Sequence, residues 1–150
     1  MAIRTIVLRE DSSLRKVSRP VTNFDERLHI LLDDMRETLI EADGVGLAAP
    51  QVGVLRRIAI VFNGVNYLEL INPEIIGTEG EQTGAEGCLS IPGICGTVSR
   101  PNFVKVRAQD RNGNHFEVGG EGLTARAFCH EIDHLNGILF TDKVIDYIEE

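Results

Sequence analysis

The segment His130-Glu131-Ile132-Asp133-His134 combines residue types and a spacing that can bind a metal ion and catalyse proton transfer. Two histidines four residues apart lie one above the other on a helix, close enough for both imidazoles to bind one tetrahedral cation. Glu131 follows the first histidine directly and is placed near the fourth coordination position, where a carboxylate can act as a general base. The segment therefore predicts a divalent-metal site in a hydrolase.

The motif needs a further ligand, because a catalytic metal site normally uses three protein ligands and leaves one position to water. One class of zinc peptidases supplies a third histidine six residues after the second, and here that position is Phe140. A downstream carboxylate is a weaker alternative, since these residues are better explained as the solvated face of a short acidic terminal helix: Asp142, Asp146, Glu149 and Glu150. Upstream, Cys88 lies beside a flexible glycine in Glu86-Gly87-Cys88-Leu89-Ser90, and its thiolate is the favoured third ligand.

Composition limits the class of protein and its partners. The chain has 150 residues, 43% of them hydrophobic, which is the usual size of one domain with one core. The formal charge of -8, with 23 acidic and 15 basic residues, argues against DNA or an anionic membrane as the main partner. No stretch approaches the ~18 apolar residues of a membrane-spanning helix, and the first residues lack the apolar core of a signal peptide. We therefore expect a single domain, residues 1–150, in the cytoplasm.

The three cysteines, Cys88, Cys95 and Cys129, are an odd number in a chain without a secretion signal. This count argues against a disulfide framework and favours thiol or metal chemistry. Cys129 precedes His130 and so lies about 100° around the helix from it, which makes it a poor second thiolate ligand. We expect the Cys129 side chain to be buried and to pack in the core.

Hydrophobic periodicity predicts two helices that flank a region of strands. Apolar residues at three- and four-residue intervals predict an amphipathic helix over 24–42, capped by Asn23 or Thr22 and ended near Asp43-Gly44. A second helix, from about Leu123 to Asn136 and ended by Gly137, carries the metal motif. Between them, β-branched runs predict strands over 58–62, 67–71, 103–108 and 115–118, separated by turns at Asn63-Gly64, Asn72-Pro73 and Asn112-Gly113.

This order of elements predicts an α+β fold rather than alternating β-α-β units. We expect antiparallel β-sheets packed around a central helix that carries the His-Glu-x-x-His motif, together with an N-terminal amphipathic helix. The metal site then lies where the central helix meets the strand or loop that holds Cys88.

Three segments together resemble a known family: Gly44-Val45-Gly46-Leu47-Ala48-Ala49-Pro50-Gln51, Glu86-Gly87-Cys88-Leu89-Ser90 and His130-Glu131-Ile132-Asp133-His134-Leu135-Asn136-Gly137. They are similar to the three signature motifs of peptide deformylase, in the family's order and at its usual spacing. The resemblance covers essentially the whole chain and, within the family, the compact bacterial type. It implies removal of the formyl group from the N-terminal formylmethionine of new polypeptides.

The resemblance also implies a role for each motif residue. It places one divalent metal ion on Cys88, His130 and His134, with Fe2+ as the physiological ion, although thiolate and imidazole ligands suit Zn2+, Ni2+ and Co2+ as well. Glu131 is then the general base and later the acid, and the Gln51 amide and the Leu89 backbone N–H stabilise the oxyanion. We expect Gly46 to present its backbone to the substrate and an apolar pocket to receive the methionine side chain, lined by Val45, Leu123 and Ala127.

The sequence departs from the usual family pattern at two places. Many members have an arginine where this chain has Ile94-Cys95-Gly96, and many have a glutamine where it has Cys129. These departures leave the metal ligands and the base in place, but they put in doubt how the peptide beyond the methionine is held. Around the ligands, we expect Glu86 to brace the cysteine loop, Arg100 to pair with Glu86, and Asp133 to orient a histidine or form a salt bridge.

The expected partner is an N-formylmethionyl peptide or nascent chain, with the ribosome as a further candidate, and the expected state is a monomer or weak dimer. Two other functions stay open on the sequence alone. A zinc endopeptidase would cleave internal peptide bonds and would not depend on Cys88. A deformylase-like protein that binds metal without catalysis would release no formate.

Overall fold

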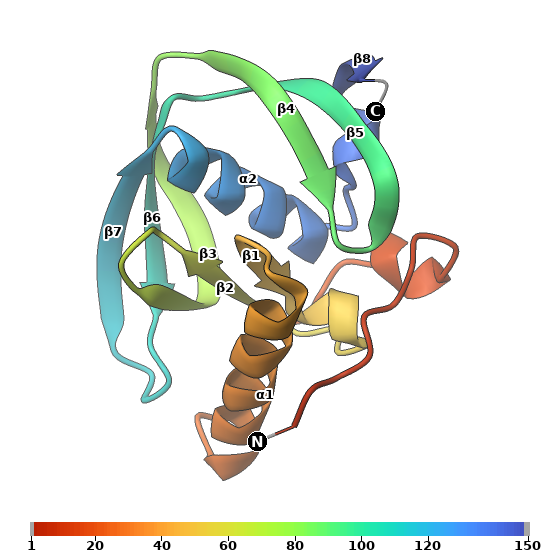
Figure 1. The fold of residues 1–150 in the computed structure, drawn as a ribbon. Coiled ribbons are helices and arrows are strands. Elements are labelled where there is room, and N and C mark those ends of the chain that lie inside the picture. The colour runs from red at the N-terminus through yellow and green to blue at the C-terminus, as the bar shows by residue number, and fades with distance from the viewer. Residues whose placement is uncertain (1, 149–150) are drawn as a thin grey trace.

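A three-layer arrangement with one helix in the middle positions the site. The computed structural model describes residues 2–148. In it α2 (Leu123–Leu135) runs between two antiparallel sheets, and α1 (Glu26–Ala42) packs beneath the edge of the larger sheet (Figure 1). The predicted α+β class, with antiparallel sheets around the helix that carries the motif, is confirmed.

The larger sheet has five strands in the order β1-β2-β3-β6-β7, with the bounds Gly46–Ala48, Ile58–Phe62, Tyr67–Glu79, Phe103–Gln109 and His115–Glu121. The smaller sheet has three strands in the order β4-β5-β8, with the bounds Gln82–Cys88, Ile91–Arg100 and Val144–Ile148. Short 3-10 helices lie at Ser12–Arg15, Ala49–Val52 and Phe140–Asp142. Helix α2 contacts β1 and β2 of the larger sheet on one side and β5 of the smaller sheet on the other.

The amphipathic helix α1 buries the face that its periodicity predicted, and Leu32, Met35 and Leu39 are fully buried. Its start differs from the prediction. Asp25 is the N-cap, because its side chain accepts a hydrogen bond from the backbone N–H of Leu28 at 3.1 Å. The expected caps, Asn23 and Thr22, lie outside the helix. Its end is as predicted, at Asp43 in the left-handed conformation (φ 54°).

The central helix α2 is buried on almost every side, and this includes its polar residues Arg126, His130, Glu131 and His134. A helix between two sheets has no solvated face, so burial of these polar groups costs desolvation energy. Polar groups at such a cost point to a functional role or to buried partners. The helix ends before Gly137 as predicted. Gly137 has φ 75°, and a Cβ there would lie 2.5 Å from the carbonyl oxygen of Arg15, so no larger residue fits.

The expected turn at Asn72-Pro73 is wrong, because β3 continues through it to Glu79 with a β-bulge between Ile71 and Glu74. Asn72 has φ 52°, and its side chain exchanges hydrogen bonds with the backbone of Val21 at 2.8 and 2.9 Å. The residues that signal a turn therefore bend a long strand and attach the N-terminal segment to it.

The expected acidic terminal helix is also wrong. Asp142 ends a 3-10 turn, Asp146 lies in strand β8, and Glu149 and Glu150 lie outside the described residues. β8 forms because it can pair with β5, where Gly96 leaves room for Val144: a Cβ on Gly96 would lie 2.7 Å from that side chain. Strands β1, β4 and β5 were not predicted. No helix within the described part of the chain has both the length and the apolar character needed to cross a membrane.

Candidate metal centre

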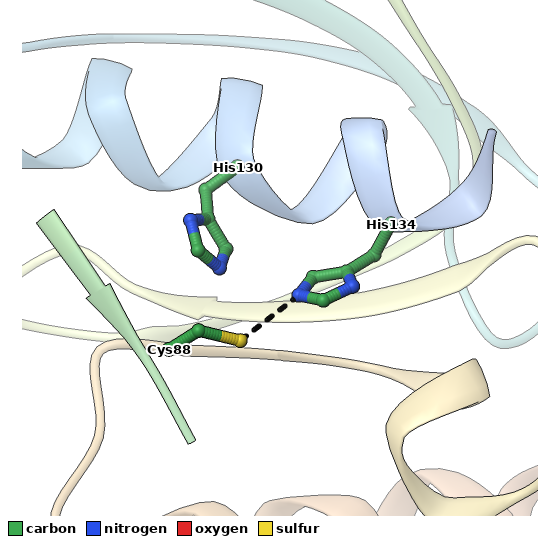
Figure 2. A group of neighbouring side chains, drawn as sticks. All are labelled: Cys88, His130 and His134. Carbon is green, nitrogen blue, oxygen red and sulfur yellow. Dashed lines mark hydrogen bonds between the residues drawn. The ribbon is translucent and has the colours of Figure 1, made fainter. Parts of the chain in front are cut away.

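The three predicted metal ligands converge from two elements that lie far apart in the sequence. Cys88 ends β4, and His130 and His134 lie on successive turns of α2 (Figure 2). Their ligand atoms all lie within 4.8 Å of one another. The Cys88 Sγ lies 3.3 Å from the Nε2 of His134. These distances between the ligand atoms leave each of them within reach of one shared cation.

The chemistry of these donors fits a divalent cation. One thiol and two imidazoles form a ligand set that iron, zinc, cobalt and nickel all accept. The Nδ1 of His130 is hydrogen-bonded to the Glu86 Oε2 at 2.9 Å, which leaves its Nε2 to face the centre. Burial lowers the pKa of His134 to about 3, so this imidazole is neutral, as a metal ligand must be.

Glu86 organises a buried group of charges behind His130. Its carboxylate accepts hydrogen bonds from Arg100 at 2.7 Å and from Arg126 at 3.0 Å, in addition to the one from His130. Burial alone would raise the pKa of Glu86, but the hydrogen bonds from His130 and Arg100 bring it down to about 2. Arg100 also pairs with Asp133 at 2.7 Å. The pairing of Arg100 with Glu86, and a salt bridge for Asp133, are as expected from the sequence.

Glu131 lies beside the predicted ligands and lines the same cavity as Cys88 and His130. Within residues 2–148 its Oε1 is buried and has no hydrogen-bond partner. Burial raises the pKa of Glu131 to about 7, which is the range in which a carboxyl group can both accept and return a proton at neutral pH. A Cβ on Gly46 would lie 2.5 Å from the Glu131 Oε2, so a glycine is required opposite this carboxylate.

The side-chain amide of Gln51 is fixed at both ends. Its Oε1 accepts a hydrogen bond from the backbone N–H of Ala48 at 2.9 Å, and its Nε2 donates to the Ser90 Oγ at 3.1 Å. The same Nε2 lies 3.6 Å from the Cys88 Sγ. These partners direct the amide N–H groups, rather than the carbonyl, toward the metal ligands.

A cavity of about 390 Å³ opens over these groups. Nine of the ten predicted site residues line it: Val45, Gly46, Gln51, Cys88, Leu89, Leu123, Ala127, His130 and Glu131. The tenth, His134, is buried beneath. Leu123 is 62% exposed and so lies at the rim of the cavity rather than deep in an apolar pocket. Cys129 is buried in the core next to Phe128, as expected.

Two residues of the site escaped the sequence analysis. Ser90 is fully buried and holds the Gln51 amide, and its signal was its place directly after Leu89 in the cysteine motif. Arg126 lines the cavity and binds Glu86. It precedes His130 by four residues on α2, so the same helical spacing that joins the two histidines could have identified it.

Comparison with known proteins agrees with this geometry. The family described as polypeptide deformylase matches residues 3–149. A peptide deformylase of Caldicellulosiruptor bescii is 57% identical over all of this chain and 90% of its own length, and one of Alkaliphilus metalliredigens is 59% identical over 97% of this chain and 99% of its own. The crystal structure of the Thermotoga maritima enzyme has a TM-score of 0.93 at 41% identity, over 96% of this chain and 99% of that one.

These matches support the deformylase interpretation over the zinc-endopeptidase and non-catalytic alternatives that the sequence left open. They span nearly the full length of this chain and of both relatives. The chain belongs to the peptide deformylase family, metal-dependent enzymes that remove the N-formyl group from the N-terminus of newly made polypeptides.

Proposed function

We propose that the Cys88 Sγ and the Nε2 atoms of His130 and His134 hold one divalent cation, and that Glu131 carries the proton in formamide hydrolysis beside it. The observation that carries this proposal is the convergence of the three ligand atoms within 4.8 Å of one another, next to the buried Glu131 Oε1, which has no hydrogen-bond partner among residues 2–148. When bound, such a cation acts as a Lewis acid that lowers the pKa of a coordinated water toward about 7.

Glu131 then takes a proton from the water that attacks the formyl carbon, and it returns the proton to the amine nitrogen as the carbon–nitrogen bond breaks. The products are formic acid and a free N-terminal amine, which are formate and an ammonium group at neutral pH, so atoms and protons balance. Burial raises the pKa of Glu131 to about 7. This value supports both steps, because the group can serve as base and as acid in one cycle.

Two hydrogen-bond donors would stabilise the oxyanion of the tetrahedral intermediate. One is the Gln51 Nε2, which its contacts with Ser90 and Ala48 hold in place. The other is the backbone N–H of Leu89, which lies in the two-residue turn between the paired residues Cys88 and Ile91. A fixed donor aimed at developing charge is typically worth ~10²–10³ in rate.

The formylmethionine side chain would lie against Val45 and Ala127, with Leu123 over the opening. All three line the cavity, and a flexible thioether packs well against apolar walls of irregular shape. Gly46 would offer its backbone to the substrate main chain. Its lack of a side chain supports this role, since any Cβ would strike Glu131.

For the physiological ion we propose Fe2+, with Zn2+, Ni2+ or Co2+ as substitutes, because a thiolate and two imidazoles accept all four. We further propose that residues 1–150 act as one catalytic domain in the cytoplasm, as a monomer or weak dimer, on N-formylmethionyl nascent chains at or near the ribosome. The net charge of -8 supports a polypeptide rather than DNA or a membrane as the partner.

The proposal is tested by formate release from formyl-Met-Ala with anaerobically purified protein, together with metal content. Glu131→Gln is expected to keep one metal per chain and to lose at least ~10²-fold in turnover, since the general base is gone. Cys88→Ala is expected to lose the metal itself. Full turnover by Glu131→Gln, or full metal content in Cys88→Ala, would refute the assigned roles.

A further inference from the structure

A second hollow of about 260 Å³ opens beside the active-site cavity. The two share a wall made of Gly93, Ile94 and Cys95, where β5 begins. Arg9, Tyr147 and Ile148 complete the lining of the second hollow. It is therefore built from the N-terminal segment and from β8, at the edge of the smaller sheet, and not from the motifs that form the metal centre.

The N-terminal segment is fastened directly to two of those motifs. The backbone N–H of Val7 donates to the carbonyl of Gln51 at 2.8 Å, and the N–H of Arg9 donates to the carbonyl of Ser90 at 3.0 Å. These bonds place Arg9 beside the turn that carries Leu89, although the two residues are 80 positions apart. The backbone of Arg9 thus has a defined position relative to the reacting groups.

Arg9 gives the second hollow its charge. The other lining residues among the described part of the chain are neutral: Gly93, Ile94, Cys95, Tyr147 and Ile148. The Arg9 side chain is exposed, and no carboxylate of residues 2–148 forms a salt bridge with it. The wall shared with the active-site cavity leaves free space at Gly93, where a Cβ would meet no atom within 4 Å.

The geometry of the substrate directs the polypeptide toward this hollow. The methionine Cα carries the formylated nitrogen, the side chain and the carbonyl that continues the chain, so the three groups must leave it in different directions. In the proposed function the nitrogen points to Cys88 and Glu131, and the side chain lies against Val45 and Ala127. Among the other residues that line the cavity, Gly93, Ile94 and Cys95 also line the second hollow, so a chain that leaves the methionine on this side enters that hollow.

We propose that the second hollow binds the residues that follow formylmethionine, and that Arg9 selects for an acidic side chain among them. The proposal rests on the proposed function and extends it to the choice of substrate. An exposed charge pair is worth about 0.2–1 kcal/mol, so the selection is a modest one.

The test compares kcat/KM for formyl-Met peptides that carry one Glu or one Lys at the second, third or fourth position and alanine elsewhere. For the metal-loaded protein at low ionic strength, we expect a preference for Glu of roughly two- to five-fold at one of these positions, and its loss at high salt. Arg9→Ala is expected to abolish the preference, and Arg9→Glu to reverse it. All variants should hydrolyse N-formylmethionine amide equally, because it has no residue beyond the methionine that could reach the hollow.

Arg27→Glu is the matched control, since it makes the same change of net charge on an exposed residue at the far end of α1 from Gly44. The preference for Glu should survive in this control. Formate release from the Glu and Lys peptides at equal kcat/KM, or an equal shift in Arg9→Glu and Arg27→Glu, would overturn the subsite while leaving the proposed function intact. No release from formyl-Met-Ala would instead refute the proposed function.

Discussion

The Glu86 carboxylate lies 2.9 Å from the Nδ1 of His130 and is held there by two buried guanidinium groups, those of Arg100 and Arg126. This contact fixes the tautomer and the orientation of a proposed metal ligand, since it leaves the Nε2 of His130 to face Cys88 and His134. The side chains of Glu86 and Arg100 are only 4% and 3% exposed. Any change to Glu86 therefore acts on the metal and on the charge balance of the core together.

Glu86→Gln should lower metal affinity by about 10–100-fold, because the outer partner of a ligand histidine loses its charge. It should also destabilise the fold by about 3–5 kcal/mol, since two buried guanidinium groups lose their counter-charge. Competition with a chelator measures the first effect and urea unfolding the second. Glu81→Gln is the control, because Glu81 is an exposed neighbour on the turn before β4. Unchanged metal affinity in Glu86→Gln would contradict the orienting role.

Gly46→Ala should reduce kcat by an order of magnitude or more while the metal stays bound. The new Cβ would lie 2.5 Å from the Glu131 Oε2, so the carboxylate must turn away from its place, and small displacements of a proton-carrying group are costly in rate. Gly77→Ala is the matched control, because the nearest atom to its Cβ would be the Lys105 Cβ at 3.7 Å. Equal kinetics for the two variants would argue against a constraint on Glu131.

The sequence was sufficient to predict the elements whose signals are local. Helix α1 and helix α2 follow from apolar spacing, and the two histidines from their place on one helical face. The strand that carries Cys88 was not predicted, because β4 contains glycines at positions 84 and 87 and has little apolar alternation. β8 was mistaken for a helix, since its stability comes from pairing with β5 and from the room that Gly96 gives Val144. Such partners are set by tertiary structure and cannot be derived from local propensity.

The family motifs predicted the proposed ligands and the proposed base, whereas the groups that hold them came from the structure. Ser90 binds Gln51, which lies 39 positions away in the sequence, and Arg126 binds Glu86, which lies 40 positions away. Hydrogen bonds of this range depend on how β4, β5 and α2 pack. Spacing within α2 could have placed Arg126 on the face of His130, but spacing rules apply within one element and so do not predict the contact of Arg126 with Glu86 or of Ser90 with Gln51.

Ser90→Ala should lower kcat by several-fold and leave KM nearly unchanged. The Gln51 amide would lose the acceptor that fixes it, and a loosened oxyanion donor costs less than the ~10²–10³ of a deleted one. Steady-state kinetics on formyl-Met-Ala measures the effect. The double variant Gln51→Ala/Ser90→Ala provides the control: if Ser90 acts through Gln51, it should be no slower than Gln51→Ala alone. Additive losses would show that Ser90 acts through another group.

The attachment of the N-terminal segment to α1 should weaken in acid. Asp34 accepts hydrogen bonds from the backbone N–H of Ala2 at 2.8 Å and from the Arg4 guanidinium at 2.9 Å. Burial alone would raise the pKa of Asp34, but these bonds lower it below its ordinary value of 3.8. A depressed pKa contributes stability that is fully present above pH ~4 and is lost as the pH falls through the folded-state value.

Asp34→Asn should therefore cost about 1–3 kcal/mol at pH 7, the range for hydrogen bonds to a charged group. The difference from the wild type should shrink as the pH falls below ~4, because the wild-type carboxyl is then protonated as well. Urea unfolding of both proteins between pH 7 and pH 3 measures this convergence. Asp33→Asn is a control on the same helix: its carboxylate is 38% exposed and shares Arg111 with Glu69, so its effect should stay small. A cost for Asp34→Asn that does not change with pH would mean that packing, and not the charge, attaches the segment.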